Sequence, residues 1–251
     1  MLFHSQLFPI YEEVAVKAQI LFGSMVLAAC FGATGCGSAK HEMTPQQTEQ
    51  RAQLADEDSK VAQTAQAYKA MDNAGLLKKL GEQSAHKREP FNSLAYRELV
   101  TRKDVDPKQL VAMVNESKNG DALLPLLLLR QLDQKTYAQV PVEVKASVLT
   151  DALEKSKTFN TWGLPNFYLE DASKALLECG KAAYPALRRM LSDTRPAPVW
   201  GGGKLRAASQ QYGYRLCDYA LFFLKSEPGQ PSFVEPAAAA ERDALIKAIA
   251  K

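Results

Sequence analysis

Histidine is the side chain most often used for acid–base catalysis near neutral pH, and this chain has only His4, His41 and His86. All three precede the part of the sequence that has the pattern of a compact domain. His41-Glu42 lacks a second histidine four residues further on, so the zinc-protease motif is not present. We therefore expect no histidine-dependent catalytic triad, no metal site and no cofactor.

Other catalytic patterns are equally incomplete. The glycines at 201–203 follow no strand and are not followed by the Lys-Ser/Thr pair of a phosphate-binding loop. Glu170 and Asp171 are adjacent, so on a helix they point in different directions and cannot act as an acid–base pair across one substrate. The expectation is a protein that is not an enzyme, with an unrecognised carboxylate-based site as the alternative.

A polar and aromatic cluster surrounds a long loop near the end of the chain. Two interpretations stay open. Arg195 and Arg215 could pair with Asp193 and Asp218 to hold the loop, with tyrosine hydroxyls capping the network. Alternatively, the cluster forms a groove for a peptide or an acidic group, because tyrosine, tryptophan and arginine are the usual anchors of interfaces. The candidate binding residues are Arg195, Trp200, Tyr212, Tyr214, Arg215 and Asp218.

The most apolar stretch of the chain lies near its start. Ile20 to Ala29 is about half the ~20 residues that a membrane-spanning helix needs. Lys17, this apolar run and the small residues that follow have the order of a signal peptide. The residues before Lys17 fit that pattern poorly, so we expect translation to begin at Val16.

Small residues that lead into a cysteine resemble the bacterial lipoprotein signal. Residues 27–29 precede Cys30 in one such site, and residues 33–35 precede Cys36 in another. We favour Cys36, because a small polar segment beginning at Gly37 follows it. The resemblance implies a cleaved chain with several acyl chains on this cysteine, tethered to the envelope and, in a cell with two membranes, to the outer one. An uncleaved anchor and lipid-free secretion are the alternatives.

Two further cysteines, Cys179 and Cys217, lie in the expected helical domain. Export would place them in an oxidising compartment, where disulfides form. Neighbouring helices bring Cα atoms to disulfide distance only at close contacts. Three alternatives therefore stay open: two small buried core residues, a Cys179–Cys217 disulfide, or a reactive or metal-binding pair, although two thiols without further ligands make a poor metal site.

The composition, rich in alanine, leucine, lysine and glutamate, predicts an all-α fold of antiparallel helical pairs with no convincing strand. Asp106-Pro107 is a helix-start signal, and Gly180 is a helix stop. The stretch at 204–224 is expected to be one long helix with a single apolar stripe. The predicted helices of the compact part are 94–100, 107–117, 121–132, 141–156, 168–180, 181–193, 204–224 and 237–250.

One helical pair resembles the HEAT-like repeat, through Ala175-Leu176, Gly180, Ala183, Pro185-Ala186-Leu187 and Asp193. The resemblance implies a short, irregular solenoid, with an irregular helical bundle as the alternative. The expected organisation is a signal peptide at 1–36, a polar and helical tether at 37–89, the HEAT-like domain at 90–225, and a proline-rich connector with a final helix at 226–251.

Charge bears on the class of partner. The net charge is +3, and no long basic block is present, so nucleic-acid binding has no electrostatic support. We expect a membrane-tethered envelope protein that binds another protein or an envelope component without catalysis. An envelope enzyme or enzyme accessory is the first alternative, and a structural spacer is the second.

Overall fold

The computed structural model of the chain describes residues 59–60, 62–82, 93–116, 121–225, 227 and 236–249. These residues belong to one compact unit, Ala55–Lys251. The expected signal segment, Cys30, Cys36, the three histidines and nearly all of the connector at 226–235 lie outside the described residues.

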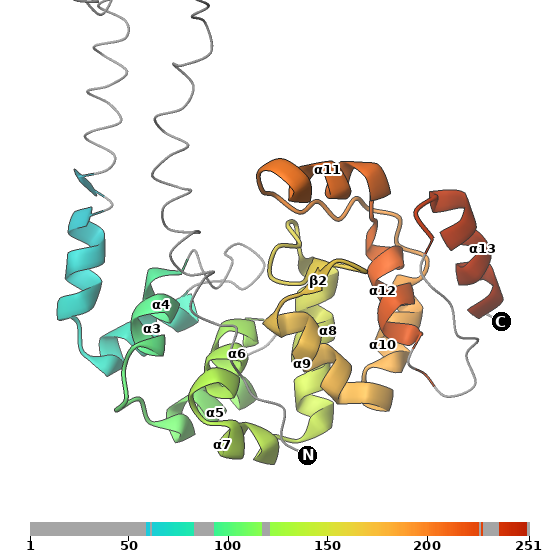
Figure 1. The fold of residues 1–251 in the computed structure, drawn as a ribbon. Helices are drawn as coiled ribbons and strands as arrows, with labels where there is room; N and C mark the ends of the chain where they lie inside the picture. Colours follow the sequence, from blue (N-terminus) through green and yellow to red (C-terminus); the bar gives the residue numbers. More distant parts are fainter. Residues whose placement is uncertain are drawn as a thin grey trace, which may run out of the picture. The chain divides into compact units, whose positions relative to one another are not determined.

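Helices account for most of the described residues, which confirms the all-α class (Figure 1). Helical residues at 59–60 and 62–70 come first. The following elements are α3 (Asn73–Glu82), α4 (Leu94–Val100), α5 (Pro107–Glu116), α6 (Leu123–Leu132), α7 (Gln134–Gln139), α8 (Val142–Lys155), β1 (Gly163–Leu164), β2 (Tyr168–Leu169), α9 (Asp171–Cys179), the 3-10 helix η3 (Gly180–Ala182), α10 (Tyr184–Met190), α11 (Gly203–Tyr212), α12 (Leu216–Leu224) and α13 (Ala239–Ile249).

Local capping chemistry sets the helix starts that the sequence predicts. The Ser93 hydroxyl accepts a hydrogen bond from the Tyr96 amide at 3.1 Å and caps α4. The Asp106 carboxylate accepts from the Lys108 amide at 3.0 Å, immediately before Pro107 opens α5. Both predicted starts are confirmed.

α6 lies at the centre of the packed core. Every residue from Leu123 to Leu129 is buried, and α6 packs against α3, α4, α5, α7, α8 and α9. A helix that is apolar on nearly all sides is normally covered by neighbouring elements, as α6 is here. Among the described residues, no helix has the length and apolarity needed to cross a bilayer.

α3 belongs to the same core, although its residues fall within the predicted tether at 37–89. Leu76, Leu77 and Leu80 are buried, and α3 packs on α4. The preceding helical stretch ends before Asp72, whose carboxylate accepts from the Gly75 amide at 2.8 Å and starts α3. The packed part of the chain therefore includes residues before the predicted start near Pro90.

The turn between α9 and α10 has the predicted form. Gly180 ends α9 with φ +50°, a backbone conformation that favours glycine. Leu187, Met190 and Leu191 point into the core from α10 and the residue that follows it. α9 packs on α8, and α10 packs on α12. The helical pair α9–α10 therefore connects α8 to α12 within the described core.

The segment at 158–167, which falls between the predicted helices at 141–156 and 168–180, is more than a connecting loop. β1 and β2 form an antiparallel hairpin in which Gly163 pairs with Leu169 and Leu164 pairs with Tyr168. The prediction that no strand is present is wrong here. Gly163 has φ +81°, and a fully buried Trp162 lies beside it. So short a pairing has no alternating pattern that a sequence could display.

The predicted long helix at 204–224 is two helices. α11 ends at Tyr212 because Gly213 adopts the left-handed conformation, with φ 51° and ψ 48°. Tyr214 is not helical, and its carbonyl accepts a hydrogen bond from the Ala197 amide at 2.8 Å. α12 then begins at Leu216. The single apolar stripe that the sequence predicts is therefore wrong, because the two helices do not share one axis.

Candidate binding surface

The long loop at 191–202 is held against the start of α12 by backbone hydrogen bonds. The Cys217 amide donates to the Asp193 carbonyl at 2.8 Å, and the Leu216 amide donates to the Arg195 carbonyl at 2.9 Å. These bonds satisfy amides in the first turn of α12, which lack partners inside the helix. The predicted cluster therefore forms where this loop meets α12.

Both ion pairs of the structural interpretation are present. Arg195 Nη2 lies 2.9 Å from Asp193 Oδ2, and Arg215 Nη2 lies 2.9 Å from Asp218 Oδ1. Arg195 also donates to the Glu154 carbonyl at 2.6 Å, which ties the loop to α8. The hydrogen bond from Arg195 holds the pKa of Asp193 below its ordinary value.

α13 extends this pairing into a buried network. Arg242 Nε lies 3.1 Å from Asp218 Oδ1, and neither side chain is exposed to solvent. Arg215 also reaches Asp243 Oδ1 at 2.7 Å. Burial alone would raise the pKa of Asp218, but the two guanidinium groups lower it below its ordinary value. The carboxylate is therefore charged and fully committed to structural contacts.

The buried Arg242 satisfies its remaining nitrogens on backbone oxygens. Nη2 donates to the Tyr212 carbonyl at 2.8 Å, and Nη1 donates to the Pro236 carbonyl at 3.1 Å. Its guanidinium carbon lies 5.0 Å from the centre of the Tyr214 ring, within the range of a cation–π contact. Arg242 was not among the predicted site residues, because the last helix was expected to be a segment separate from the domain. The adjacent charges of Arg242 and Asp243 in an alanine-rich helix were the available signal.

Aromatic rings form a continuous chain from the hairpin turn into the core. Phe167 meets Tyr212 edge-on at 5.1 Å, Tyr212 stacks on Tyr214 at 5.3 Å, and Tyr214 meets Tyr219 at 6.0 Å between ring centres. Tyr219 then contacts Phe159 at 4.8 Å. Such pairs add stability beyond their buried area and restrict the positions of the rings.

The hydroxyls of Tyr214 and Tyr219 donate to the β1–β2 hairpin and not to the ion network, unlike in the structural interpretation. Tyr214 Oη donates to the Pro165 carbonyl at 3.1 Å, and Tyr219 Oη donates to the Gly163 carbonyl at 2.6 Å. Both acceptors lie in the β1–β2 hairpin, which the sequence did not reveal. The hydroxyls therefore join α12 and the residues before it to the hairpin.

The predicted binding residues differ sharply in exposure. Asp218 is fully buried and Tyr214 is 3% exposed, whereas Trp200 is 68% exposed. The expectation that all six line one accessible groove is not met, because the ion network and the ring chain cover Asp218 and Tyr214. Phe167, 50% exposed at the hairpin turn, was missed.

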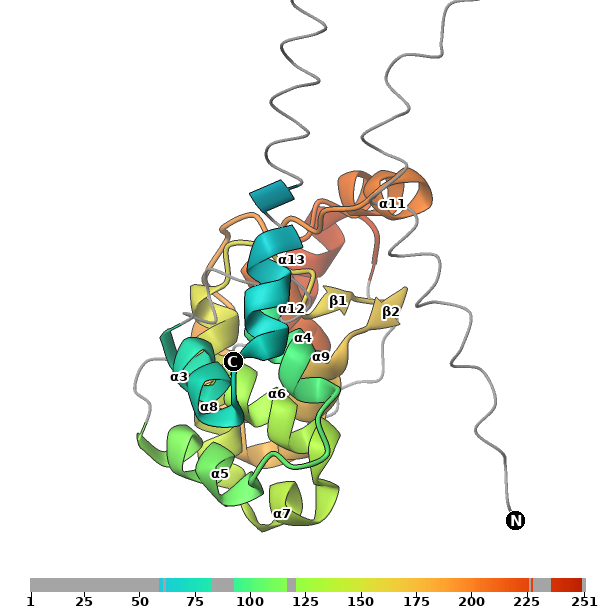
Figure 2. The ribbon, with the colours of Figure 1, turned by 90° about the vertical axis from the view of Figure 1, so that its left-hand side faces the viewer.

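The accessible part of the cluster lies around α11. Figure 1 and Figure 2 both place α11 over the end of the β1–β2 hairpin. Trp200 precedes α11, while Phe167 contacts Tyr212 at its last residue. Lys204 and Arg206 are exposed on the helix itself. We define the aromatic–basic surface as Phe167, Trp200, Lys204, Arg206 and Tyr212.

Cys179 and Cys217 are buried free thiols, so the disulfide alternative is not formed in the structure. Cys179 ends α9, and its thiol contacts the Ala175 carbonyl of the same helix at 3.3 Å. Cys217 lies in the first turn of α12, and not in the second half of one long helix at 204–224 as the predicted helix bounds imply. Burial raises the pKa of each thiol to about 11.

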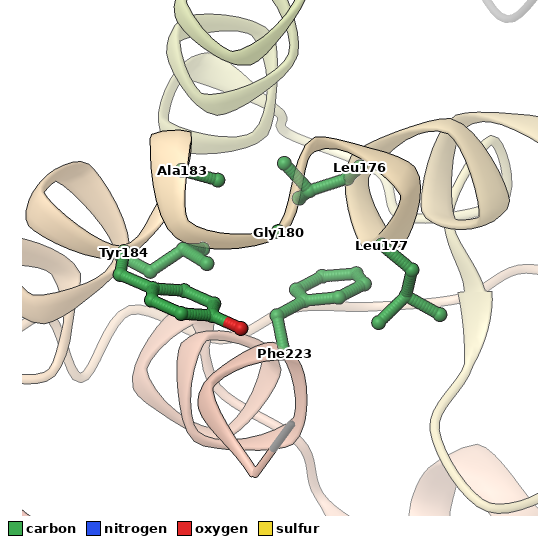
Figure 3. Close-up of a pocket in the computed structure, with 7 residues that line it drawn as sticks. Leu176, Leu177, Gly180, Ala183, Tyr184 and Phe223 are labelled. Atoms are coloured by element: carbon green, nitrogen blue, oxygen red, sulfur yellow. The ribbon is translucent and has the colours of Figure 1, made fainter. Parts of the chain in front are cut away.

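A small gap lies where the turn between α9 and α10 meets α12 (Figure 3). The Phe223 ring lies between Leu177 and Tyr184, below the turn at Gly180. The volume of about 10 Å³ holds at most one water molecule. This gap is therefore a packing feature and not a ligand site.

A wider polar cleft of about 270 Å³ lies between α8 and α10. α8 lines this cleft with hydroxyl and carboxylate side chains, and α10 lines it with one arginine. The lining residues are Ser147, Thr150, Asp151, Glu154 and Arg189. The Asp151 carboxylate is bonded to Lys155 at 2.8 Å, which partly neutralises the acidic face.

Among the described residues, no three His, Cys, Asp or Glu side chains are arranged to hold a metal ion. Comparison with known proteins adds no assignment to this geometry: no family model matches the chain, and neither a curated protein nor a solved structure is significantly similar to it.

Proposed function

We propose that this chain is a membrane-tethered envelope protein that binds another protein or an envelope component without catalysing a reaction. The binding site is the aromatic–basic surface. The observation that carries the proposal is Trp200, a residue that is 68% exposed although its backbone is firmly held. The Trp200 amide donates to Asn160 Oδ1 at 2.9 Å, and its carbonyl accepts from Asn160 Nδ2 at 2.6 Å.

A fixed, exposed tryptophan is a feature of interfaces rather than of free surface. Leaving a large apolar ring in water is unfavourable, and tryptophan is among the residues that dominate binding energy. The two bonds to Asn160 hold the chain on either side of the ring, so little backbone freedom is lost on binding. Phe167 provides a second exposed ring, held by its contact with Tyr212.

The finer architecture is also part of the proposal: the helices form a short, irregular HEAT-like solenoid. The support is the turn at Gly180, the proline early in α10, and the packing of α9 on α8 and of α10 on α12. Stacked helical pairs of this kind present extended surfaces for partners. The irregular bundle remains the alternative architecture.

Photo-crosslinking in intact cells tests the binding proposal. Benzoylphenylalanine at position 200 should capture a defined partner, whereas the same residue at Val142, which is exposed at the start of α8, should not. Equal capture at both positions, or none at position 200, would contradict the proposed surface.

The tether is tested separately from the surface. We propose lipidation at Cys36, with Cys30 as the alternative site, and residence on the periplasmic face of the outer membrane in a cell with two membranes. Labelled palmitate should mark the wild-type chain and the Cys30→Ala variant but not the Cys36→Ala variant. Label that persists in Cys36→Ala and disappears in Cys30→Ala would show that Cys30 is the lipidated residue. Absence of label from all three forms would contradict the proposed lipid tether.

The polar cleft between α8 and α10 favours a second candidate, an envelope enzyme or enzyme accessory. Asp151 and Glu154 both line it, and paired carboxylates can serve as acid and base. This candidate predicts that the purified chain turns over an envelope substrate and that Asp151→Asn and Glu154→Gln each abolish turnover. The binding proposal predicts no such activity.

A further inference from the structure

The segment at 194–217, which contains α11, carries charged side chains of one sign only. No aspartate or glutamate occurs anywhere from residue 194 to residue 217. Of the basic residues in that range, Arg195 is paired with Asp193, and Arg215 is paired with Asp218 and Asp243.

Lys204 and Arg206 are different. Both are exposed, and neither forms an ion pair within the described residues. They lie two positions apart in the first half of α11, so their side chains project toward opposite edges of its exposed face, and Lys204 lies four residues after Trp200. This part of the surface therefore combines two available cations with an exposed indole ring, and no acidic side chain from the same segment neutralises them.

We propose that the aromatic–basic surface docks an acidic segment of a partner protein, an inference that rests on the proposed function. Carboxylates of the partner pair with Lys204 and Arg206, and an apolar side chain of the partner packs on the Trp200 ring. The ion pairs set the orientation and speed of association, while the ring supplies much of the affinity.

The other exposed positions of α11 favour a protein over a lipid surface. A helix that lies on a membrane presents an apolar face to the lipid. The exposed residues of α11 other than its first glycine are Lys204, Arg206, Ala207, Gln210 and Gln211, and its larger apolar side chains are half-buried against the domain. Glutamine amides can hydrogen-bond to a peptide backbone, but they gain nothing from burial in acyl chains.

Binding of a short fluorescein-labelled peptide of alternating glutamate and leucine to the full chain in detergent tests the inference. Peptides with glutamine or lysine in place of glutamate are the comparison probes. The acidic peptide should bind tightest, its affinity should fall with added salt, and it should shield Trp200 from acrylamide quenching. Trp162 is fully buried and contributes an unquenched background.

The variants separate charge from shape. Lys204→Glu with Arg206→Glu should weaken the acidic peptide about tenfold or more, and Trp200→Ala should weaken it by a similar factor. The matched control is Lys135→Glu with Lys181→Glu, which changes the net charge equally at exposed positions outside the surface and should leave the affinity within about twofold.

Each contrary result has one meaning. Equal effects of the two double variants, or equal binding of the three peptides, would overturn the acidic-partner inference. Binding to phosphatidylglycerol vesicles that needs Lys204 and Arg206, without peptide binding, would assign the surface to lipid and also overturn it. Photo-crosslinked capture at position 200 that persists in the Lys204→Glu, Arg206→Glu variant would support the proposed function but contradict the acidic-partner inference. Absence of capture at position 200 would contradict the proposed function itself.

Discussion

At the scale of single residues, Asp218 is the centre of the contacts between α12 and α13. It accepts from the backbone amide and the guanidinium of Arg215, and it neutralises the buried Arg242. A buried ion pair contributes little compared with apolar packing, but removal of one partner leaves an uncompensated charge. The network therefore makes the position of α13 specific.

Replacement of Asp218 by asparagine should lower the free energy of unfolding by about 3 kcal/mol, because Arg242 keeps its charge without a counterion. Urea unfolding followed by far-UV circular dichroism measures the loss. Asp243→Asn is the matched control, since that carboxylate is half exposed, and it should cost less than about 1 kcal/mol. Similar losses in both variants would contradict the central role of Asp218.

The same carboxylate should make stability depend on acidity. The folded-state pKa of Asp218 lies below the ordinary value of 3.8. The ionised carboxylate therefore makes its full contribution to stability at pH values above 3.8. The contribution is lost as pH falls through the folded-state pKa. The difference in unfolding free energy between wild type and Asp218→Asn should be constant down to about pH 4 and shrink below it. A difference that changes most near neutral pH would contradict this assignment.

The two core cysteines should be unreactive in the folded chain. Burial raises the pKa of both thiols to about 11, so little thiolate is present at mildly alkaline pH, and the sulfur atoms are shielded. Maleimide labelling followed by peptide mass spectrometry should modify Cys179 and Cys217 only after unfolding. A Cys179–Cys217 linked peptide from unreduced protein would instead establish the disulfide alternative.

At the scale of elements, the positions of two glycines decide how the candidate surface is presented. Gly213 ends α11 and lets the next residues pair with the loop that carries Trp200. Gly163 opens the hairpin whose turn carries Phe167. Without these two turns, the exposed rings would not lie at opposite ends of α11.

Alanine at these two glycines should have unequal effects. At Gly213 the space for a Cβ atom is open, so only the positive φ is unfavourable, at about 1 kcal/mol. At Gly163 a Cβ atom would lie 2.5 Å from the Tyr168 carbonyl oxygen in addition to the φ of +81°, so the hairpin must shift. Denaturant unfolding should show a clearly larger loss for Gly163→Ala. Gly213→Asn, which tolerates the left-handed region, is the control and should lose less than Gly213→Ala.

At the scale of the whole molecule, the sequence predicts what depends on near neighbours in the chain. The starts at Ser93 and Pro107 and the stop at Gly180 follow from capping chemistry, and the buried α6 follows from its leucines. The pairing of Arg215 with Asp218 is also local, one turn apart on a helix start.

What the sequence did not predict depends on contacts between distant segments. The hairpin is too short to show a strand pattern, and its hydrogen bonds to Tyr214 and Tyr219 form only in the folded chain. The break at Gly213 was not predicted because the apolar pattern of one helix continues across this glycine in the sequence. Arg242 could be recognised as a core residue only once α13 was placed on α12.

The last helix offers a test of this organisation. A chain that ends at Lys225 loses Arg242 and Asp243, and Arg188 loses its partners Glu227 and the Ile249 carbonyl. The core around α6 uses none of these contacts, so the helical circular dichroism signal should largely persist. Because Asp218 keeps only Arg215 and the Tyr214 ring loses its cover, unfolding should require about 3 kcal/mol less free energy than in the full chain. Arg242→Ala should reproduce most of that loss if the buried network, rather than the apolar face of α13, holds the helix in place. A truncated chain as stable as the full one would mean that α13 contributes nothing to the fold and that the charge network is incidental.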